Sequence, residues 1–247
     1  MPGLWRTIDG PAGGLRVYAT PVSSPGPVIM LCHELPRDPD GATEPGRGYP
    51  ALADRLADEC ACRVVVGMLR GTGGSDGDFS ADGWLDDLAA VADAEVGPEG
   101  SLWVIGFGFG AAIALRTATR EPRVRGVASV AGPADLTAWV ASRDKVLARC
   151  RRSGVIRSED FPHDPDAWVA ELIALAPLDA AARLGDRPLL VVHGSDDAEV
   201  PVAAARALAD AAPGGPVDLR IVPGAGHWLR ADPRVVATLV GWIERQR

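Results

Sequence analysis

Residues 102–111 read LWVIGFGFGA and decide the fold of this chain of 247 residues. The apolar run 102–105 predicts a strand buried on both faces, and the closely spaced glycines after it predict a sharp turn into a helix. The same pattern recurs along the chain. Strands are expected at 15–19, 28–32, 63–68, 102–105, 124–130, 189–193 and 219–222, and helices at 51–59, 84–96, 110–120, 202–212 and 233–245. This alternation predicts an α/β fold with a mostly parallel, doubly wound sheet flanked by helices.

The interval 133–187 breaks this alternation. It contains no convincing strand, and helical patterns cover only 136–152 and 166–175. More than fifty residues are too many for a plain connection within a compact domain. We therefore expect a small helical cap at 133–187, inserted into a single core domain formed by 1–132 and 188–247. The stretch 36–50 is expected to be a loop.

Composition excludes several classes of protein. The formal net charge of −8 argues against a nucleic-acid-binding protein, which needs a basic face. No apolar run approaches the length of a membrane span, and the first residues lack the apolar run of a signal peptide, so a cytoplasmic protein is expected. The four cysteines have no metal-binding spacing and are expected to be reduced structural thiols. No metal and no organic cofactor is implied.

The glycine-rich turn has three interpretations. Gly106, Gly108 and Ala111 match the dinucleotide fingerprint G-x-G-x-x-A. Gly106 and Gly110 also match the flanks of the nucleophile elbow G-x-S-x-G, with Gly108 at the serine position. The third interpretation is close packing of strand on helix without chemistry. Local sequence does not separate them, because both motifs occupy a sharp strand–turn–helix.

The segments that follow the other predicted strands help to decide between these interpretations. Ligands of open α/β sheets bind at the carboxyl ends of the strands. After the strand 189–193 the chain continues HGSDDAEVP at 193–201, and after 219–222 it continues PGAGHW at 223–228. The strand 28–32 leads into CHELP at 32–36, and the strand 63–68 into RGTGGSDG at 70–77. A dinucleotide-binding domain predicts none of these blocks.

Together these blocks resemble the α/β-hydrolase superfamily, most closely its bacterial serine aminopeptidase-like and dienelactone-hydrolase-like members. The resemblance extends over about 16–242 and includes the order elbow, acid, histidine. It implies that Asp197 is the triad acid and His227 the base, with Asp196 a weaker candidate for the acid. It also implies that the backbone N–H groups of Leu35 and Phe109 form an oxyanion hole.

Other candidate residues have competing interpretations. The resemblance implies that His33 and His193 belong to the strand-end motifs, with His193 a structural residue and His33 a candidate oxyanion- or substrate-binding residue of the oxyanion loop. His163 is expected on the cap surface. The aromatic residues Trp139 and Trp168 are expected either to line a substrate pocket or to pack the cap on the core. Positive charge in the cap indicates either an anionic substrate or a solvated helix face; the charged side chains are Arg143, Lys145, Arg149, Arg151, Arg152 and Arg157.

Two residues depart from the superfamily pattern. Gly108 has no side chain and cannot attack a carbonyl, so the usual acyl-enzyme cannot form at this position. Glu34 replaces the usual glycine of the oxyanion loop and brings a carboxylate to the mouth of the site. It either acts as a general acid or base or points outward and pairs with Arg37, Arg47 or Arg70.

Three functions remain open. The first is an enzyme for small esters, lactones or amides in which His227 and Asp197 activate water, or move a proton in a non-hydrolytic reaction. The second is a non-catalytic protein that binds a small molecule under the cap. The third is a serine hydrolase inactivated by an engineered Ser-to-Gly change at Gly108. The expected partner is a small molecule, neither nucleic acid nor membrane, and a homodimer stays open.

Overall fold

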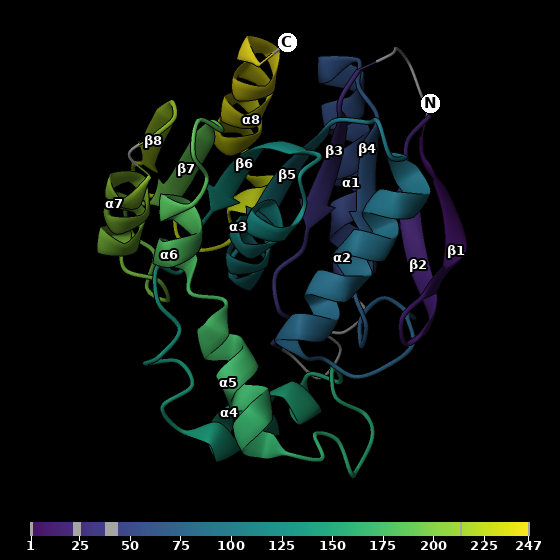
Figure 1. Cartoon of the computed structure of the whole chain (residues 1–247). Coiled ribbons are helices and arrows are strands. Elements are labelled where there is room, and N and C mark those ends of the chain that lie inside the picture. Colours follow the sequence, from purple (N-terminus) through teal and green to yellow (C-terminus); the bar gives the residue numbers. More distant parts are fainter. Residues whose placement is uncertain (1, 22–25, 38–43, 213, 247) are drawn as a thin grey trace.

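Eight strands form a single sheet in the order β1-β2-β4-β3-β5-β6-β7-β8 (Figure 1). The computed structural model describes residues 2–21, 26–37, 44–212 and 214–246. Strands β3 to β8 run parallel, whereas β2 pairs antiparallel with both β1 and β4. The strands are β1 (Leu4–Gly10), β2 (Gly13–Ala19), β3 (Val28–Cys32), β4 (Val64–Gly67), β5 (Leu102–Phe107), β6 (Val124–Val130), β7 (Leu189–Gly194) and β8 (Val217–Val222). The mostly parallel α/β sheet predicted from the sequence is therefore confirmed.

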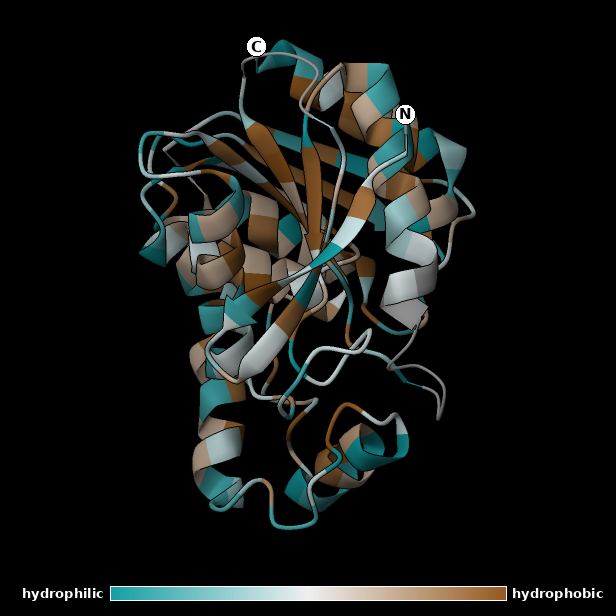
Figure 2. Cartoon of the chain, turned by 90° about the vertical axis from the view of Figure 1, so that its right-hand side faces the viewer, coloured by the Kyte–Doolittle hydropathy of each residue, from teal (hydrophilic) through white to brown (hydrophobic). Residues whose placement is uncertain are grey.

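Helices cover both faces of this sheet. Helices α1 (Glu44–Cys60) and α8 (Pro233–Arg245) pack on one face, where Trp103 of β5 meets Trp242 of α8 with ring centroids 5.2 Å apart. The opposite face is covered by α2 (Ala81–Glu95), α3 (Phe109–Arg120), α6 (Pro177–Ala182) and α7 (Val202–Ala211). Figure 2 shows hydrophobic strands inside and hydrophilic residues on the outer faces of the helices. Burial on both faces explains why the central strands are continuous apolar runs.

Some elements differ from the predicted ones. Strand β1 was not expected, because it is an edge strand whose residues are mostly exposed and which therefore lacks an apolar pattern. The short helix α6 was also missed. Helix α1 begins at Glu44, within the predicted loop 36–50, and contains Pro50. A proline lacks the N–H donor that a helix interior needs, so the pattern placed the start after it. Residues 38–43 of that loop lie outside the described residues.

The segment between β6 and β7 forms helices α4 (Arg143–Arg152), α5 (Pro165–Ala174) and α6. Helices α4 and α5 lie apart from the helices that flank the sheet, beyond one end of the strands (Figure 1). Helix α6 instead packs against α3 and α7. Trp168 of α5 is buried and donates from its indole nitrogen to the Phe79 carbonyl oxygen, 2.9 Å away, which fixes α5 to the loop before α2.

Strand register places the predicted site at one edge of the sheet. Cys32 at the end of β3 lies opposite Gly106 in β5, so the residues that follow both strands are neighbours. Gly194 at the end of β7 lies opposite Val222 of β8 in the same way. Because all of these strands are parallel, the loops at their carboxyl ends meet above the sheet.

Candidate active site

Gly108 lies between β5 and α3 in a strained backbone conformation. Its φ of 52° and ψ of −123° fall in a region that residues with a side chain rarely adopt. The flanking positions 106 and 110 have no room for a side chain. A β-carbon on Gly106 would lie 2.3 Å from the Gly110 carbonyl oxygen, and a β-carbon on Gly110 would lie 2.3 Å from the His33 carbonyl oxygen. The turn thus presents position 108 at the top of the sheet, in the manner of a nucleophile elbow.

His227 and Asp197 meet beside this turn. The His227 Nδ1 atom lies 2.8 Å from Asp197 Oδ2, and both side chains are almost completely buried. The other ring nitrogen, Nε2, lies 3.3 Å from the point that a β-carbon on Gly108 would occupy. A carboxylate bound to Nδ1–H holds the ring in the tautomer that leaves Nε2 free to accept a proton. The pair is therefore oriented for general base chemistry at position 108.

The Asp197 carboxylate is held by its own loop as well. Its Oδ1 accepts hydrogen bonds from the backbone N–H groups of Glu199 and Val200, both at 2.9 Å. The His193 Nε2 atom lies 2.9 Å from the Val200 carbonyl oxygen and 3.3 Å from Asp197 Oδ2. These contacts place His193 in a supporting position beneath the acid. Asp196 points elsewhere and accepts from the Ser195 hydroxyl at 2.6 Å.

The Glu34 side chain faces inward and pairs with an arginine that is far away in the sequence. Its Oε1 accepts from Arg230 at 2.6 Å, and the Tyr49 hydroxyl lies 3.5 Å from the same oxygen. Burial raises the pKa of Glu34, although the positive charge of the paired Arg230 partly opposes this effect. Its Oε2 would lie 3.7 Å from a β-carbon on Gly108. The carboxylate therefore stands beside the position of the missing nucleophile.

The pairing of Glu34 differs from each of the expected pairs. Arg37 forms an ion pair with Glu199, and its charge also acts on Glu34. Arg70 binds Asp87 at 2.7 Å. The Arg47 side chain lies outside the described residues. Arg230 is separated from Glu34 by 196 positions in the sequence, and no local pattern indicated that the two would meet.

His33 supports the oxyanion loop from below. It is fully buried, its Nδ1 lies 2.9 Å from the Glu34 carbonyl oxygen, and its Nε2 lies 3.2 Å from the Leu69 amide nitrogen. Burial lowers the pKa of His33 to about 4, so the ring is neutral at pH 7 and accepts from Leu69 N–H. It does not line the cavity. These contacts join the loop after β3 to the loop after β4.

The backbone N–H groups of Leu35 and Phe109 are available as donors. Both residues line the cavity described below. Within the described part of the chain, neither amide donates a hydrogen bond to another residue. Backbone donors that lack a protein acceptor and face a cavity are suited to stabilising an oxyanion.

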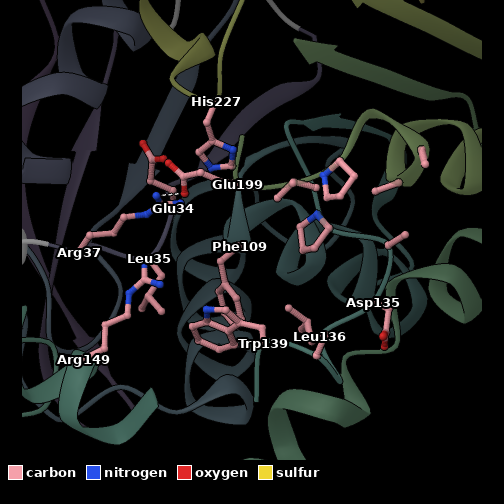
Figure 3. Close-up of a pocket in the computed structure, with 17 residues that line it drawn as sticks. Glu34, Leu35, Arg37, Phe109, Asp135, Leu136, Trp139, Arg149, Glu199 and His227 are labelled. Carbon is pink, nitrogen blue, oxygen red and sulfur yellow. Dashed lines mark ion pairs between the residues drawn. The ribbon is translucent and has the colours of Figure 1, made fainter. Parts of the chain in front are cut away.

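A cavity of about 720 Å³ opens over His227. Its wall combines Glu34, Leu35, Phe109 and His227 with residues of the segment after β6, namely Leu136, Trp139 and Arg149 (Figure 3). This volume suits a small organic molecule. Trp139 therefore lines the cavity, as one of its two interpretations predicted, whereas Trp168 does not and serves packing instead.

A replacement nucleophile is absent from this wall. No Ser, Thr or Cys is among the described residues that line the cavity. Cys32 is fully buried, and burial raises the pKa of its thiol far above the usual range. The Ser75 hydroxyl is buried and donates to the Met68 carbonyl oxygen at 2.5 Å. His163 is exposed on the surface.

Two further findings concern metals and membranes. Within the described ranges, no group of three or more His, Cys, Asp or Glu side chains is arranged to hold a metal ion. None of the helices in the part that the structure describes is both long enough and apolar enough to span a bilayer.

Comparisons with known proteins agree with this geometry. Residues 28–239 match the sequence model of the alpha/beta hydrolase family. The chain is 26% identical to a monoacylglycerol lipase of Mycolicibacterium smegmatis over 276 aligned residues, which cover 94% of both proteins.

Solved structures show the same fold. Alpha/beta hydrolase domain-containing protein 10 from mouse superimposes with a TM-score of 0.74 at 16% identity, covering 99% of this chain and 100% of the other. A meta-cleavage product hydrolase from Pseudomonas fluorescens IP01 superimposes with a TM-score of 0.69 at 19% identity, covering 98% of both chains. With its elbow after β5, Asp197 after β7 and His227 after β8, this chain belongs to the alpha/beta hydrolase family.

Proposed function

We propose that the protein hydrolyses small carbonyl compounds, with esters as the first class to test, by activating water directly with His227. The observation that supports this most strongly is the alignment of Asp197, His227 and Gly108: a complete acid–base pair faces a position that has no nucleophile. The name of the mycobacterial relative, a monoacylglycerol lipase, supports an ester as the bond that is cleaved. Lactones and amides share the same carbonyl chemistry.

A water molecule fits beside Gly108, in the space into which the serine side chain of other members would extend. This space is bounded by His227 Nε2 and Glu34 Oε2, which would lie 3.3 Å and 3.7 Å from a β-carbon on Gly108. A water placed there, at van der Waals distance from the Gly108 Cα atom, is within hydrogen-bond reach of His227 Nε2. The glycine thus provides room for the nucleophile that it does not itself supply.

The reaction follows from these positions. His227 Nε2 takes a proton from the water while the oxygen attacks the carbonyl carbon of the substrate. The carbonyl oxygen becomes an oxyanion and accepts hydrogen bonds from the N–H groups of Leu35 and Phe109. The protonated His227, stabilised by Asp197, then gives its proton to the leaving group as the carbon–oxygen or carbon–nitrogen bond breaks. No covalent intermediate with the protein forms.

Glu34 fits this scheme because its charge is balanced. An isolated carboxylate next to the oxyanion would oppose the reaction. The ion pair with Arg230 offsets that charge, and Glu34 Oε2 remains on the same side as the attacking water. We assign Glu34 the role of holding this water in line with His227. The residues of α4 and α5, together with 133–142, would act as the cap over the cavity.

Two variants test the proposal with p-nitrophenyl butyrate as the substrate. His227→Ala removes the base and is expected to lower kcat/KM by roughly 10²–10⁴-fold. Gly108→Ala adds a methyl group 3.3 Å from His227 Nε2, which crowds the water beside this atom, and is expected to cause a similar loss. His163→Ala, at an exposed position far from the cavity wall, is the control and should match the wild type.

The two variants separate the parts of the proposal. Full activity of His227→Ala would exclude this histidine as the base. Full activity of Gly108→Ala, together with loss in His227→Ala, would retain the base but exclude water at position 108. A covalent acyl adduct on the wild-type protein, detected by intact mass, would exclude direct attack by water.

A further inference from the structure

The charged groups on the cavity wall differ in their partners. Asp135, which also lines the cavity, accepts a hydrogen bond from the Thr137 hydroxyl at 2.8 Å. Glu34 is paired with Arg230, and Glu199 with Arg37. These pairs lie at the His227 end, where the chemistry is proposed. Arg149 enters the cavity from α4, on the other part of the wall (Figure 3).

Arg149 has no carboxylate partner within the described residues. Its guanidinium lies over the Trp139 ring, 6.0 Å from the centroid. Two other arginines of the same helix are bound by the protein: Arg143 binds Asp144 and Asp166, and Arg151 donates to two backbone carbonyl oxygens. Arg149 is thus a partly buried cation without a counter-charge from the residues that the structure describes.

Two aromatic side chains lie between the Arg149 guanidinium and the turn at Gly108. The Trp139 ring lies 5.6 Å from that of Phe109, and Phe109 follows Gly108 directly in the chain. Leu136 adds a further apolar side chain to the same wall. A molecule that reaches from His227 to Arg149 would therefore cross an apolar surface between two polar ends.

We propose that Arg149 binds a carboxylate group of the substrate, which makes the substrate a small ester, lactone or amide with a carboxylate at the far end of an apolar chain or ring. The inference rests on the proposed function for the reacting end. A guanidinium in a partly dry cavity gains most from an anion that replaces its lost water. A carboxylate matches the single charge of Arg149, whereas a doubly charged phosphate would leave one charge unbalanced.

Binding without turnover tests this subsite. We would measure the affinities of phenylbutyrate and of the neutral phenylbutyramide by isothermal titration calorimetry. The wild type is expected to bind the acid about tenfold more tightly than the amide, because a hydrogen bond to a charged group is lost with the amide. Arg149→Gln should bring the two affinities together, and Arg149→Lys, which keeps the charge, should retain part of the preference.

Arg152→Gln is the matched control. Arg152 is an exposed arginine at the end of the same helix and does not line the cavity. Equal affinity of the wild type for acid and amide, no measurable binding of the acid at millimolar concentration, or a preference that survives in Arg149→Gln would each overturn the subsite.

Kinetics distinguish this proposal from the proposed function. With monoethyl adipate, Arg149→Gln is expected to raise KM about tenfold with little change in kcat, whereas with diethyl adipate both constants should match the wild type. If neither ester is hydrolysed but the acid is still bound through Arg149, the hydrolysis is wrong and the subsite stands. If both esters are hydrolysed equally well by wild type and variant, the subsite is wrong and the hydrolysis stands.

Discussion

The Nε2 atom of His227 lies 3.3 Å from the point that a β-carbon on Gly108 would occupy. A serine hydroxyl built on that carbon would be within hydrogen-bond reach of the base, so the histidine has kept the position that a serine nucleophile needs. The backbone at Gly108 keeps the elbow conformation too, with φ at 52°. The turn and His227 therefore have the geometry of a nucleophile elbow and its base, although residue 108 carries no side chain.

Gly108→Ser should accordingly create a reactive serine. We expect covalent labelling by a fluorophosphonate, seen as an added mass on the intact protein, and no labelling when His227→Ala is combined with it. The positive φ should make the variant less stable than the wild type by about 1–3 kcal/mol. An unlabelled Gly108→Ser protein that remains folded would show that the turn does not present a nucleophile to His227.

Asp197→Asn should lower kcat by roughly 10²–10⁴-fold with little change in KM. The amide cannot stabilise the protonated ring as the carboxylate does, while Asp197 is not part of the described cavity wall that contacts the substrate. Asp196→Asn is the matched control, because that exposed neighbour binds Ser195 instead of His227. A larger loss in the control than in Asp197→Asn would reverse the assignment of the acid.

Glu34→Gln should change how stability depends on pH. A raised pKa means that the folded state holds the proton more tightly than the unfolded state does, so ionisation of Glu34 costs stability as the pH rises from its ordinary value of 4.5. The free energy of unfolding of the wild type, relative to that of Glu34→Gln, should therefore fall as the pH rises above 4.5. Urea unfolding of both proteins at pH 4 and at pH 8, values chosen as roughly bracketing that transition, measures the difference. If the difference in unfolding free energy between the two proteins is the same at both pH values, ionisation of Glu34 does not cost stability in the folded state.

His33 should make the protein sensitive to acid. Its pKa of about 4 lies below the ordinary 6.5, so the folded state resists protonation and stability falls as the pH drops from about 6.5 toward 4. The expected loss by pH 4.5 is about 2–3 kcal/mol. Titration followed by NMR should show that the His33 ring stays neutral near pH 5, while urea unfolding measures the loss. His163→Asn should leave the slope unchanged, and His33→Asn should reduce it.

Gly110→Ala should destabilise the fold by about 1–3 kcal/mol or more, because its methyl group would lie 2.3 Å from the His33 carbonyl oxygen. Gly26→Ala is the control, since a β-carbon there meets no atom within 4 Å. Thermal and urea unfolding of both variants checks the difference. Equal stability of the two variants would show that the turn can accommodate a β-carbon at position 110.

The sequence predicted the elements that are buried on both faces and missed those that are not. The central strands are continuous apolar runs, so their pattern was clear. In β1, Leu4 and Trp5 are 76% and 36% exposed, and an edge strand of this kind has no apolar pattern to recognise. Helix α1 was shortened in the prediction because Pro50 lies inside it.

The sequence predicted those site residues that come soon after the end of a predicted strand. The resemblance carried by the blocks after the strands implied Asp197 as the acid and His227 as the base, and the structure brings the two side chains to 2.8 Å. The Glu34–Arg230 pair was not predictable, since its members are 196 positions apart and the arginine lies in no motif. The distinction between Trp139 in the cavity and Trp168 in the core depends on how α5 packs, which side-chain periodicity does not determine.

The cavity wall comes from separate parts of the chain. Glu34, Leu35, Phe109 and His227 lie at the strand ends, and Ala203 and Ala204 lie at the start of α7. The segment between β6 and β7 provides Leu136, Trp139 and Arg149. A chimera that exchanges 133–176 for the corresponding segment of another family member would change which molecules enter without touching the groups assigned to bond cleavage. Reactivity and selectivity can thus be redesigned, and can diverge in evolution, as independent modules of one chain.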